Sequence, residues 1–383
     1  MSGNRFEQLT ALGQSLWLDQ MRRSLITSGE LKQLIADGVR GLTSNPTIFE
    51  KAISGSNDYE NDLRALTQKG ASVQEVYEAL TVEDIANAAD LFRGVYDKSN
   101  AHDGFVSLEV SPLLAHDTAG TIKEAKELFA KLKRPNVMIK VPGTPEGLPA
   151  IEELIAAGLN VNVTLIFSVA VYEKVAEAYI RGLERRADAG QAVDRSASVA
   201  SFFLSRIDTA TDKELEALQK SGAAPAEKIT PLLGKAAIAS AKLAYESFER
   251  VFYGERFAAL KEKGAMVQRP LWASTSTKNP QYSDVMYVDT LIGPDTVNTV
   301  PPNTLEAFRD HGTPAVTLTQ DLDKAKKVFA DLGALGINFT KITDKLTADG
   351  VASFSDSFRQ LLSVIETRRK EVAVQTASAS AKS

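Results

Sequence analysis

Short apolar runs rich in Val, Ile, Leu and Phe alternate along the chain with longer segments that have the apolar period of a helix. This alternation is typical of successive βα units that build a parallel sheet. Eight of the runs predict strands, at residues 15–18, 39–43, 105–110, 137–141, 160–167, 198–204, 270–274 and 295–300. Eight strands separated by helices predict an α/β fold of the (β/α)8 TIM barrel type.

The helical segments between the strands are longer than a minimal barrel needs. In "PEGLPAIEELIAAG", an apolar stripe runs from Leu148 to Ile155, and Gly158 suits the position just after a helix. A barrel of this type takes about 250 residues, whereas the chain has 383. We therefore expect one barrel domain over residues 1–370, with charge-rich helical insertions near 51–90 and 208–250. The small, polar segment 371–383 is expected to be a disordered tail.

Polar side chains interrupt the apolar alternation in six of the predicted strands. Because side chains alternate between the two faces of a strand, Val137, Ile139 and Val141 share one face and Lys140 lies on the other. The same period turns further side chains inward near the carboxyl ends of strands, where barrel active sites are built. These are Asp19, Thr43, Asn45, Glu109, Asn162, Thr164, Ser201 and Phe203, with Arg206 just beyond its strand. One inward polar residue is usually a satisfied core hydrogen bonder, but recurrence in six strands indicates a site.

Lys140 is the most informative of these residues. It lies within the apolar run "NVMIKVPGT", where an ammonium group loses its hydration with no compensation evident in the adjacent residues. Burial favours the neutral amine, which is nucleophilic and can condense with a carbonyl carbon. The alternative interpretation is a salt bridge from Lys140 to Asp19 or Glu109 without any chemistry.

Composition excludes several classes of protein. The chain has no cysteine, which rules out disulfides and thiolate metal sites and favours a reducing, cytoplasmic setting. The net charge of −5 argues against a nucleic-acid surface, and no apolar run is long enough to predict a membrane span. His102, His116 and His311 lack the spacing of a metal site, and we predict that they lie in loops or on the surface. We expect no metal and no cofactor.

Five segments carry a resemblance to a known family. "GLTSNPTIFEKAI", "SLEVSPLLAHDT", "VMIKVPGTPEGLPAIEEL", "NVNVTLIFS" and "WASTSTKNP" resemble, in this order, the longer bacterial transaldolases, and the similarity extends over about residues 5–370. The resemblance implies a (β/α)8 barrel that needs no cofactor. It also implies a reaction of the pentose phosphate pathway, in which a dihydroxyacetone unit moves from a ketose phosphate to an aldose phosphate. The expected partners are sugar phosphates, and the expected assembly is a monomer or a homodimer.

The resemblance also implies a role for each candidate residue. Lys140 would form the Schiff base, Asp19 would be the general acid and base, and Glu109 with Thr164 would hold a catalytic water. The expected substrate contacts are Asn45 and Asn162 at hydroxyl groups, supported by Thr43, and Ser201, Phe203 and Arg206 toward the phosphate. Many members have an arginine after the seventh strand, where this chain offers Lys278, assisted by Ser274 or Ser276. A lysine binds phosphate as a point charge and lacks the paired donors of a guanidinium.

Two other functions are compatible with the same fold. The related small fructose 6-phosphate aldolases release the three-carbon fragment, and they carry Gln and Tyr where this chain has Glu109 and Phe203. Both differences favour a transaldolase. A catalytically silent barrel that binds sugar phosphates is the second alternative, and the joint presence of Lys140, Asp19 and Glu109 argues against it.

Overall fold

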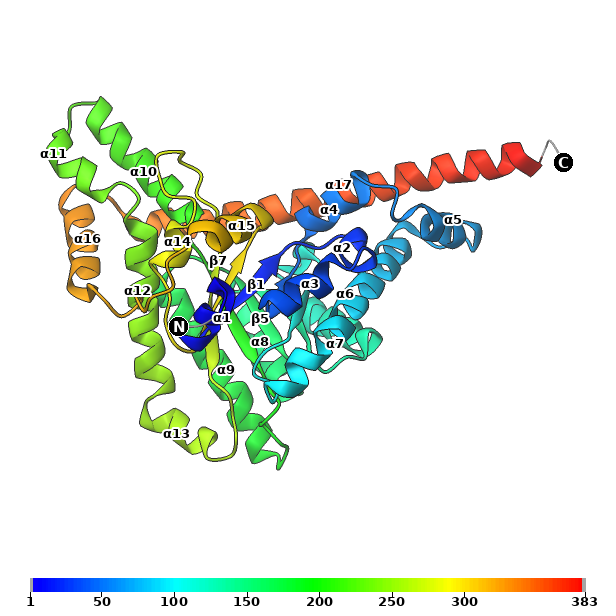
Figure 1. Cartoon of the computed structure of the whole chain (residues 1–383), viewed down its shortest axis with the longest axis horizontal. Helices are drawn as coiled ribbons and strands as arrows, with labels where there is room; N and C mark the ends of the chain where they lie inside the picture. The colour runs from blue at the N-terminus through cyan, green and yellow to red at the C-terminus, as the bar shows by residue number, and fades with distance from the viewer. Residues whose placement is uncertain (1–2, 381–383) are drawn as a thin grey trace.

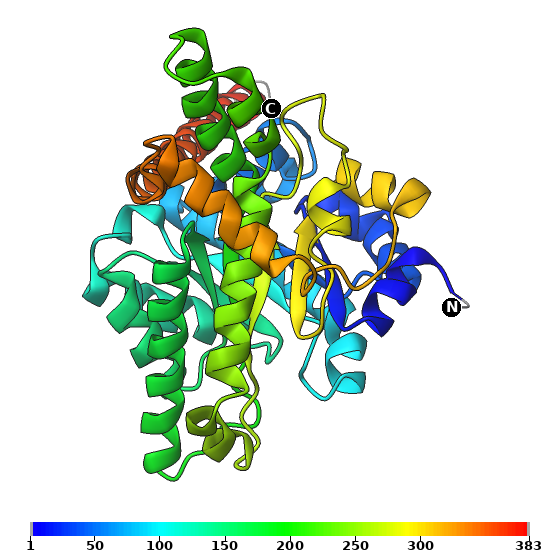
Figure 2. The ribbon, with the colours of Figure 1, turned by 90° about the vertical axis from the view of Figure 1, so that its left-hand side faces the viewer.

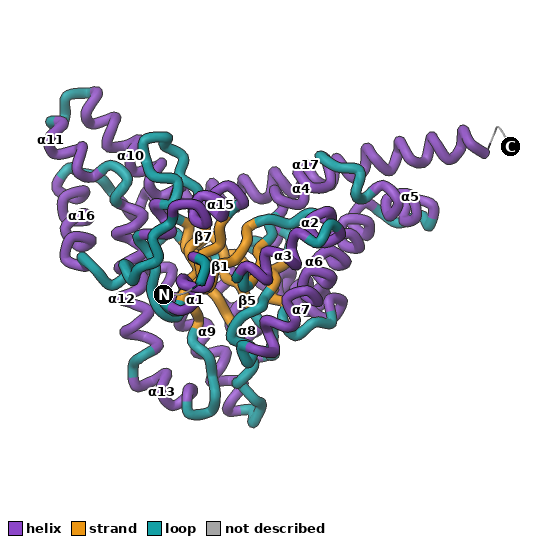
Figure 3. Tube along the Cα trace, viewed as in Figure 1, coloured by secondary structure: helices purple, strands orange, loops and turns teal. Residues whose placement is uncertain are grey.

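Eight parallel strands form a closed barrel at the centre of the computed structural model, which describes residues 3–380 (Figure 3). The strands follow one another around the barrel in sequence order, and the last pairs with the first. They are β1 (Gln14–Asp19), β2 (Gly41–Thr43), β3 (Val106–Glu109), β4 (Val137–Pro142), β5 (Val161–Ile166), β6 (Ser198–Phe203), β7 (Gln268–Ala273) and β8 (Thr296–Val300). The eight predicted strands and the predicted TIM barrel are confirmed, with strand ends that differ by about two residues at most.

Strand register brings the inward polar side chains together. Asp19 pairs with Thr43 across β1 and β2, and Lys140 pairs with Glu109 on one side and with Asn162 on the other. These residues lie near the carboxyl ends of their strands, so one end of the barrel is polar. Trp17, Met138 and Val199 lie two residues before Asp19, Lys140 and Ser201 on the same strand faces and are buried, so side chains fill the barrel interior below its polar end.

Helices surround the strands on all sides (Figure 1). Up to β5 they are α1 (Arg5–Ala11), α2 (Arg23–Thr27), α3 (Glu30–Asp37), α4 (Pro46–Ser54), α5 (Glu60–Gln68), α6 (Val73–Lys98), η1 (Pro112–Leu114), α7 (Thr118–Leu132) and α8 (Gly147–Ala156). After β5 they are α9 (Val169–Asp188), α10 (Ser205–Lys220), α11 (Ala226–Ile229), η2 (Thr230–Leu232), α12 (Ala236–Phe252), α13 (Glu255–Lys261), α14 (Met286–Asp289), α15 (Pro302–His311), α16 (Leu322–Ala334) and α17 (Phe339–Ser380). Gly158 follows α8 with φ +87°, in the left-handed conformation predicted for it.

The helices added to the barrel differ in part from the expected insertions. In the segment 51–90, α4 and α5 are additions, whereas α6 is the helix that leads into β3 and packs against it. In the segment 208–250, α10 and α11 are additions, and α12 packs against β7 and α9. The longest addition was not predicted, because it follows the last strand, where no further barrel strand marks it in the sequence. It comprises α16 and α17, whereas α15 follows β8 and packs against β1 and α1 as a barrel helix; Figure 2 shows α16 (orange) crossing α12 (light green).

Helix α17 crosses the carboxyl end of the barrel and then extends away from it (Figure 1). Phe354, Phe358, Leu361 and Ile365 are buried along one stripe, and the helix contacts α4, α5, α6, α10 and β5. The helix continues to Ser380, which includes residues 371–380 of the segment expected to be disordered; residues 381–383 lie outside the described part. A helix that is already formed extends readily through residues of high helix propensity such as the alanines of this segment.

Candidate functional site

A cavity of about 390 Å³ lies at the carboxyl end of the barrel. Nine of the residues predicted for the site line it: Asp19, Thr43, Asn45, Lys140, Ser201, Phe203, Arg206, Ser274 and Lys278. Glu109, Asn162, Thr164 and Ser276 do not line the cavity: the first three are buried beside this set, and Ser276 accepts a hydrogen bond from Lys278. The inward period of the strands therefore located the cavity.

The amine of Lys140 is buried but does not lie in apolar surroundings, so that expectation from the sequence was wrong. Its Nζ lies 3.5 Å from Oε2 of Glu109 and donates a hydrogen bond of 3.1 Å to the carbonyl oxygen of Ser44. Both ionisable side chains are only about one-twentieth exposed, at 6% and 5%. The polar groups come from neighbouring strands, which the residues adjacent to Lys140 in sequence do not reveal.

Burial makes Glu109 a weak acid. Loss of hydration raises the pKa of Glu109 to about 7, against the opposing effect of Lys140. Its Oε2 has no hydrogen-bond donor at normal distance among the described residues. Glu109 can therefore exchange a proton near neutral pH, and its Oε2, which lies beside Lys140 without a close hydrogen bond, can accept one from a further donor such as water.

Asp19 is held from one side by a pair of threonines. Thr43 donates a hydrogen bond of 2.7 Å to Oδ1 of Asp19, and the Thr43 and Thr299 hydroxyl oxygens are 2.7 Å apart. Because the Thr43 hydrogen is directed to Asp19, Thr299 is the donor in the second contact. Burial raises the pKa of Asp19, while Lys140 and the Thr43 hydrogen bond act in the opposite direction.

The amide of Asn162 is fixed on both sides. Its Nδ2 donates to Ser107 Oγ at 3.0 Å, and Ser201 Oγ donates to its Oδ1 at 2.7 Å. The Ser201 hydroxyl thus orients an amide in this structure. Thr164, two residues further along β5, has a buried hydroxyl with no hydrogen-bond partner among the described residues.

Backbone geometry next to Thr164 is unusual. The register between β5 and β6 shifts after Val163, and Leu165 has φ +60°, a conformation that leucine rarely adopts. Because an irregularity in a strand re-aims the side chains beside it, the bulge fixes where the Thr164 hydroxyl points.

Asn45 lies where β2 passes into α4. Its side chain caps that helix by accepting a hydrogen bond of 3.0 Å from the backbone N–H of Ile48. The cap uses the oxygen of the amide, so its NH2 group is the part that can donate to a molecule in the cavity.

The other side of the cavity is cationic and aromatic. The half-buried guanidinium of Arg206 lies over the rings of Phe203 and Phe354, at 5.5 Å and 5.7 Å from their centroids. Burial lowers the pKa of Arg206. Among the described residues, Arg206 makes no ion pair, which leaves its charge available to an anion. Lys278 is exposed and donates to Ser276 Oγ at 3.4 Å, whereas Ser274 contacts Ser205.

Six residues of the cavity wall were not predicted: Thr47, Ile48, Lys51, Ala273, Thr299 and Phe354. Lys51 follows Thr47 by one turn of α4, so the two side chains lie on the same face of that helix. The alternation of side chains along strands does not identify residues that reach the cavity from a helix. Thr299 was hidden because β8 carries polar residues on both faces. Phe354 belongs to α17 and had no signal in the strand pattern.

The predicted positions of the histidines are confirmed. His116 and His311 are exposed, with side chains 66% and 48% accessible, and His102 lies in the loop before β3. In the part of the chain that the structure describes, no group of three or more His, Asp or Glu side chains is arranged to hold a metal ion. Within residues 3–380, no helix is long and apolar enough to cross a membrane.

A buried amine beside two carboxylates, at the carboxyl end of a (β/α)8 barrel, is the arrangement of barrel enzymes that use a lysine nucleophile with acid–base partners. Comparison with known proteins gives the family. Residues 16–365 match the model of the family described as Transaldolase/Fructose-6-phosphate aldolase, and the chain belongs to this family.

Individual relatives cover almost the whole chain. A Nostoc punctiforme protein named Transaldolase 2 is 46% identical over 376 residues, which are 97% of this chain and 99% of the relative. A Thiobacillus denitrificans protein named Transaldolase is 47% identical over 363 residues, 94% of this chain and 99% of the relative. A Transaldolase of Saccharopolyspora erythraea is 47% identical over 366 residues, 95% of this chain and 97% of the relative.

Proposed function

We propose that the protein is a transaldolase in which Lys140 forms a Schiff base with the ketose donor. The observation that carries the proposal is the buried Lys140 amine, 3.5 Å from Glu109 and within the electrostatic influence of Asp19, at the wall of a cavity with uncommitted cations. Family membership and the names of the relatives support the same reaction.

The proposed chemistry begins with transfer of a proton from Lys140 to an adjacent base. The free amine attacks the ketone carbon of the donor, and loss of water gives an iminium ion. Asp19 then removes the proton from the hydroxyl group beside the bond that breaks. The electron pair of that carbon–carbon bond passes into the iminium, which leaves a three-carbon enamine on Lys140 and releases an aldose phosphate.

Transfer requires that the enamine outlasts the departure of the first product. The acceptor aldehyde is attacked by the enamine carbon, Asp19 returns its proton to the new alkoxide, and water hydrolyses the second iminium. Glu109 and Thr164 are suited to hold that water, because each has an oxygen without a hydrogen-bond partner among the described residues. Phe354 on α17 and Phe203 give the cavity wall an apolar part, which disfavours bulk water beside the enamine.

Cations in the cavity wall are suited to bind the phosphate group that the donor and the acceptor each carry. Arg206, Lys278 and Lys51 line the cavity, and none of the three pairs with a carboxylate among the described residues. We propose sedoheptulose 7-phosphate and fructose 6-phosphate as donors, with erythrose 4-phosphate and glyceraldehyde 3-phosphate as acceptors. We also propose a cytoplasmic protein that acts as a monomer or a homodimer.

The deciding assay follows fructose 6-phosphate with and without erythrose 4-phosphate. A transaldolase forms sedoheptulose 7-phosphate and releases little glyceraldehyde 3-phosphate when no acceptor is present. An aldolase of the same family would release it continuously together with free dihydroxyacetone. A silent binding barrel would form neither product and would yield no covalent adduct with borohydride.

The pH dependence of turnover is expected to follow Glu109. With its pKa raised to about 7, this carboxyl is mostly protonated in weak acid and mostly ionised in weak base. If the ionised form holds the water, kcat falls by about tenfold per pH unit below 7 and levels off above it. A pH series of kcat for the wild type and Glu109→Gln tests this. The variant should be slower and should lose the acid limb; an unchanged limb in Glu109→Gln would assign it to another group.

Arg206 is expected to contribute more than Lys278 to the binding of phosphorylated substrates. The guanidinium is held over two aromatic rings and offers several donors in one plane, whereas Lys278 is exposed on a flexible stem. Arg206→Ala should raise KM for fructose 6-phosphate by about one to two orders of magnitude, and Lys278→Ala by less.

Non-phosphorylated sugars are the control for this comparison. Measured as kcat/KM at constant ionic strength, the losses should shrink when the phosphate is absent. Equal losses with phosphorylated and plain sugars would mean that the two side chains support the fold and do not bind phosphate.

A further inference from the structure

A second cavity, of about 720 Å³, lies at the opposite end of the barrel from Lys140. Its wall includes Ser15 at the start of β1, Arg269 at the start of β7, and Asp295 just before β8. Helices α3 and α6 close its sides. None of the proposed catalytic residues lines this cavity, which is within the size range of pockets for small organic ligands.

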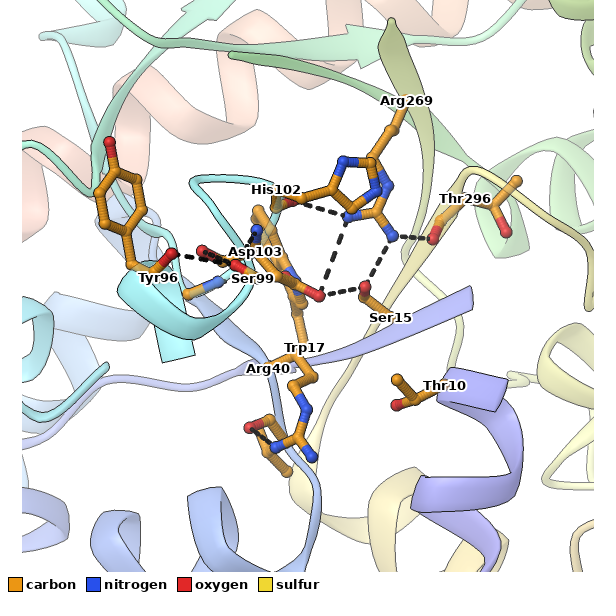
Figure 4. A network of polar contacts seen from close by, with 12 residues as sticks. Thr10, Ser15, Trp17, Arg40, Tyr96, Ser99, His102, Asp103, Arg269 and Thr296 are labelled. Atoms are coloured by element: carbon orange, nitrogen blue, oxygen red, sulfur yellow. Dashed lines mark hydrogen bonds and ion pairs between the residues drawn. The ribbon is translucent and has the colours of Figure 1, made fainter. Parts of the chain in front are cut away.

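Buried polar groups form one network in the cavity wall (Figure 4). Arg269, only 5% exposed, donates to Ser15 Oγ at 2.6 Å, to the Thr296 carbonyl at 2.5 Å and to the His102 carbonyl at 3.2 Å. The Asp103 carboxylate lies 3.9 Å from the guanidinium. It accepts hydrogen bonds from Ser15 and Trp17 instead, so it does not form a close ion pair with Arg269.

Positive charge in this cavity is incompletely compensated. Arg40 donates only to backbone carbonyls, and Lys98 has no acceptor among the described residues. Arg269 also keeps a buried Nε without a hydrogen-bond partner in that part of the chain. Three cations therefore face the two carboxylates Asp103 and Asp295, and no described ion pair in the cavity is closer than 3.9 Å.

Gly94 keeps one side of the cavity open. It lies inside α6, where a glycine costs about 0.5–1 kcal/mol relative to alanine. A Cβ added there would meet no atom within 4 Å, and the backbone is not left-handed, so neither packing nor conformation requires glycine. Leu91, Val95 and Lys98 line the cavity from the same face of α6. The glycine thus preserves space beside apolar side chains and an uncommitted cation.

We propose that this cavity is a binding site for a small organic anion, a phosphate or carboxylate that carries an apolar group. Arg40 and Lys98 bind the anionic group at the rim, with the charge of Arg269 behind them. Leu91, Val95 and Ile35 contact the apolar part. The site is independent of the proposed reaction at Lys140.

Phenyl phosphate is the probe, and the indole N–H of Trp17 is the reporter, because it donates at 2.8 Å to Asp103 in the cavity wall. The chain has two tryptophans, so a Trp272→Phe variant assigns the two indole signals in a ¹H–¹⁵N spectrum. We expect a saturable shift of the Trp17 signal with phenyl phosphate, a weaker response to inorganic phosphate and no response to phenol.

Substitutions locate the binding. Lys98→Ala should weaken it about tenfold, because a hydrogen bond to a charged group is lost. Gly94→Leu should remove it by filling the space, while Gly333→Leu on α16, where an added Cβ also meets nothing within 4 Å, should not. Arg206→Ala should leave the shift unchanged.

Three results would overturn the proposal. These are a Trp17 signal that phenyl phosphate does not move, undiminished binding in both Lys98→Ala and Gly94→Leu, and loss of the shift in Arg206→Ala. The last result would assign the phosphate to the cavity at Lys140. Because Lys98 is exposed, its replacement keeps the fold and decides the question if Gly94→Leu does not fold.

Discussion

Replacing Lys140 with methionine or arginine is expected to abolish turnover, with a loss on the order of 10⁶-fold in kcat, as when another covalent nucleophile is removed. Only a primary amine forms the iminium; methionine keeps the length of the side chain without the amine, and arginine stays protonated in proteins. The fold should survive, because the pKa of Glu109 near 7 lets this carboxyl take up a proton when its partner is lost. The measurement is kcat together with a thermal melting curve.

Borohydride reduction identifies the nucleophile directly. Wild-type protein incubated with fructose 6-phosphate and reduced should carry one adduct, on Lys140, by peptide mass spectrometry. Lys51 and Lys278 line the same cavity and are the internal controls. An adduct on either of them, or one that persists in the Lys140→Met variant, would reject the assignment.

Replacing Asp19 with asparagine or alanine is expected to lower the rate of transfer by roughly two to four orders of magnitude, the range for loss of a general base. Asparagine can still accept the hydrogen bond that Thr43 donates to Asp19 at 2.7 Å, so it keeps the geometry and loses only the ability to take a proton. Both variants should therefore be similarly slow.

The ability to form the imine distinguishes the proton-transfer role of Asp19 from the nucleophilic role of Lys140. The Asp19→Asn variant should still give the borohydride adduct, because the amine and the cavity remain. Near-normal transfer in Asp19→Asn would move the proton-transfer role to another group, and Glu109 would be the first to test.

The barrel and most of the cavity could be predicted from sequence because both depend on the alternation of side chains along strands. Asp19, Lys140 and Ser201 were each identified from their own strand, and parallel register placed them at one end. What lies beside each of them depends on the neighbouring strand. For this reason the contact of Lys140 with Glu109 and Ser44 contradicted the expected apolar surroundings.

The sequence pattern also could not predict which cavity residues have a structural role in addition. Asn45 caps α4 with its oxygen, and Ser201 orients the amide of Asn162. Both depend on the local path of the backbone after a strand, which residue type alone does not specify. Phe354 lies on α17, more than fifty residues beyond the last strand, so only the three-dimensional path of that helix reveals it.

Helix α17 also determines when the molecule becomes complete during synthesis. β8 must pair with β1 to close the barrel, and Phe354 is added to the chain only after β8 has been made. A nascent chain that has been made through β8 therefore contains every proposed catalytic group, Asp19, Glu109, Lys140 and Thr164, while the cavity still lacks Phe354 from its wall. During synthesis, the wall of the cavity at Lys140 is therefore completed only after the segment of α17 that carries Phe354 has been made.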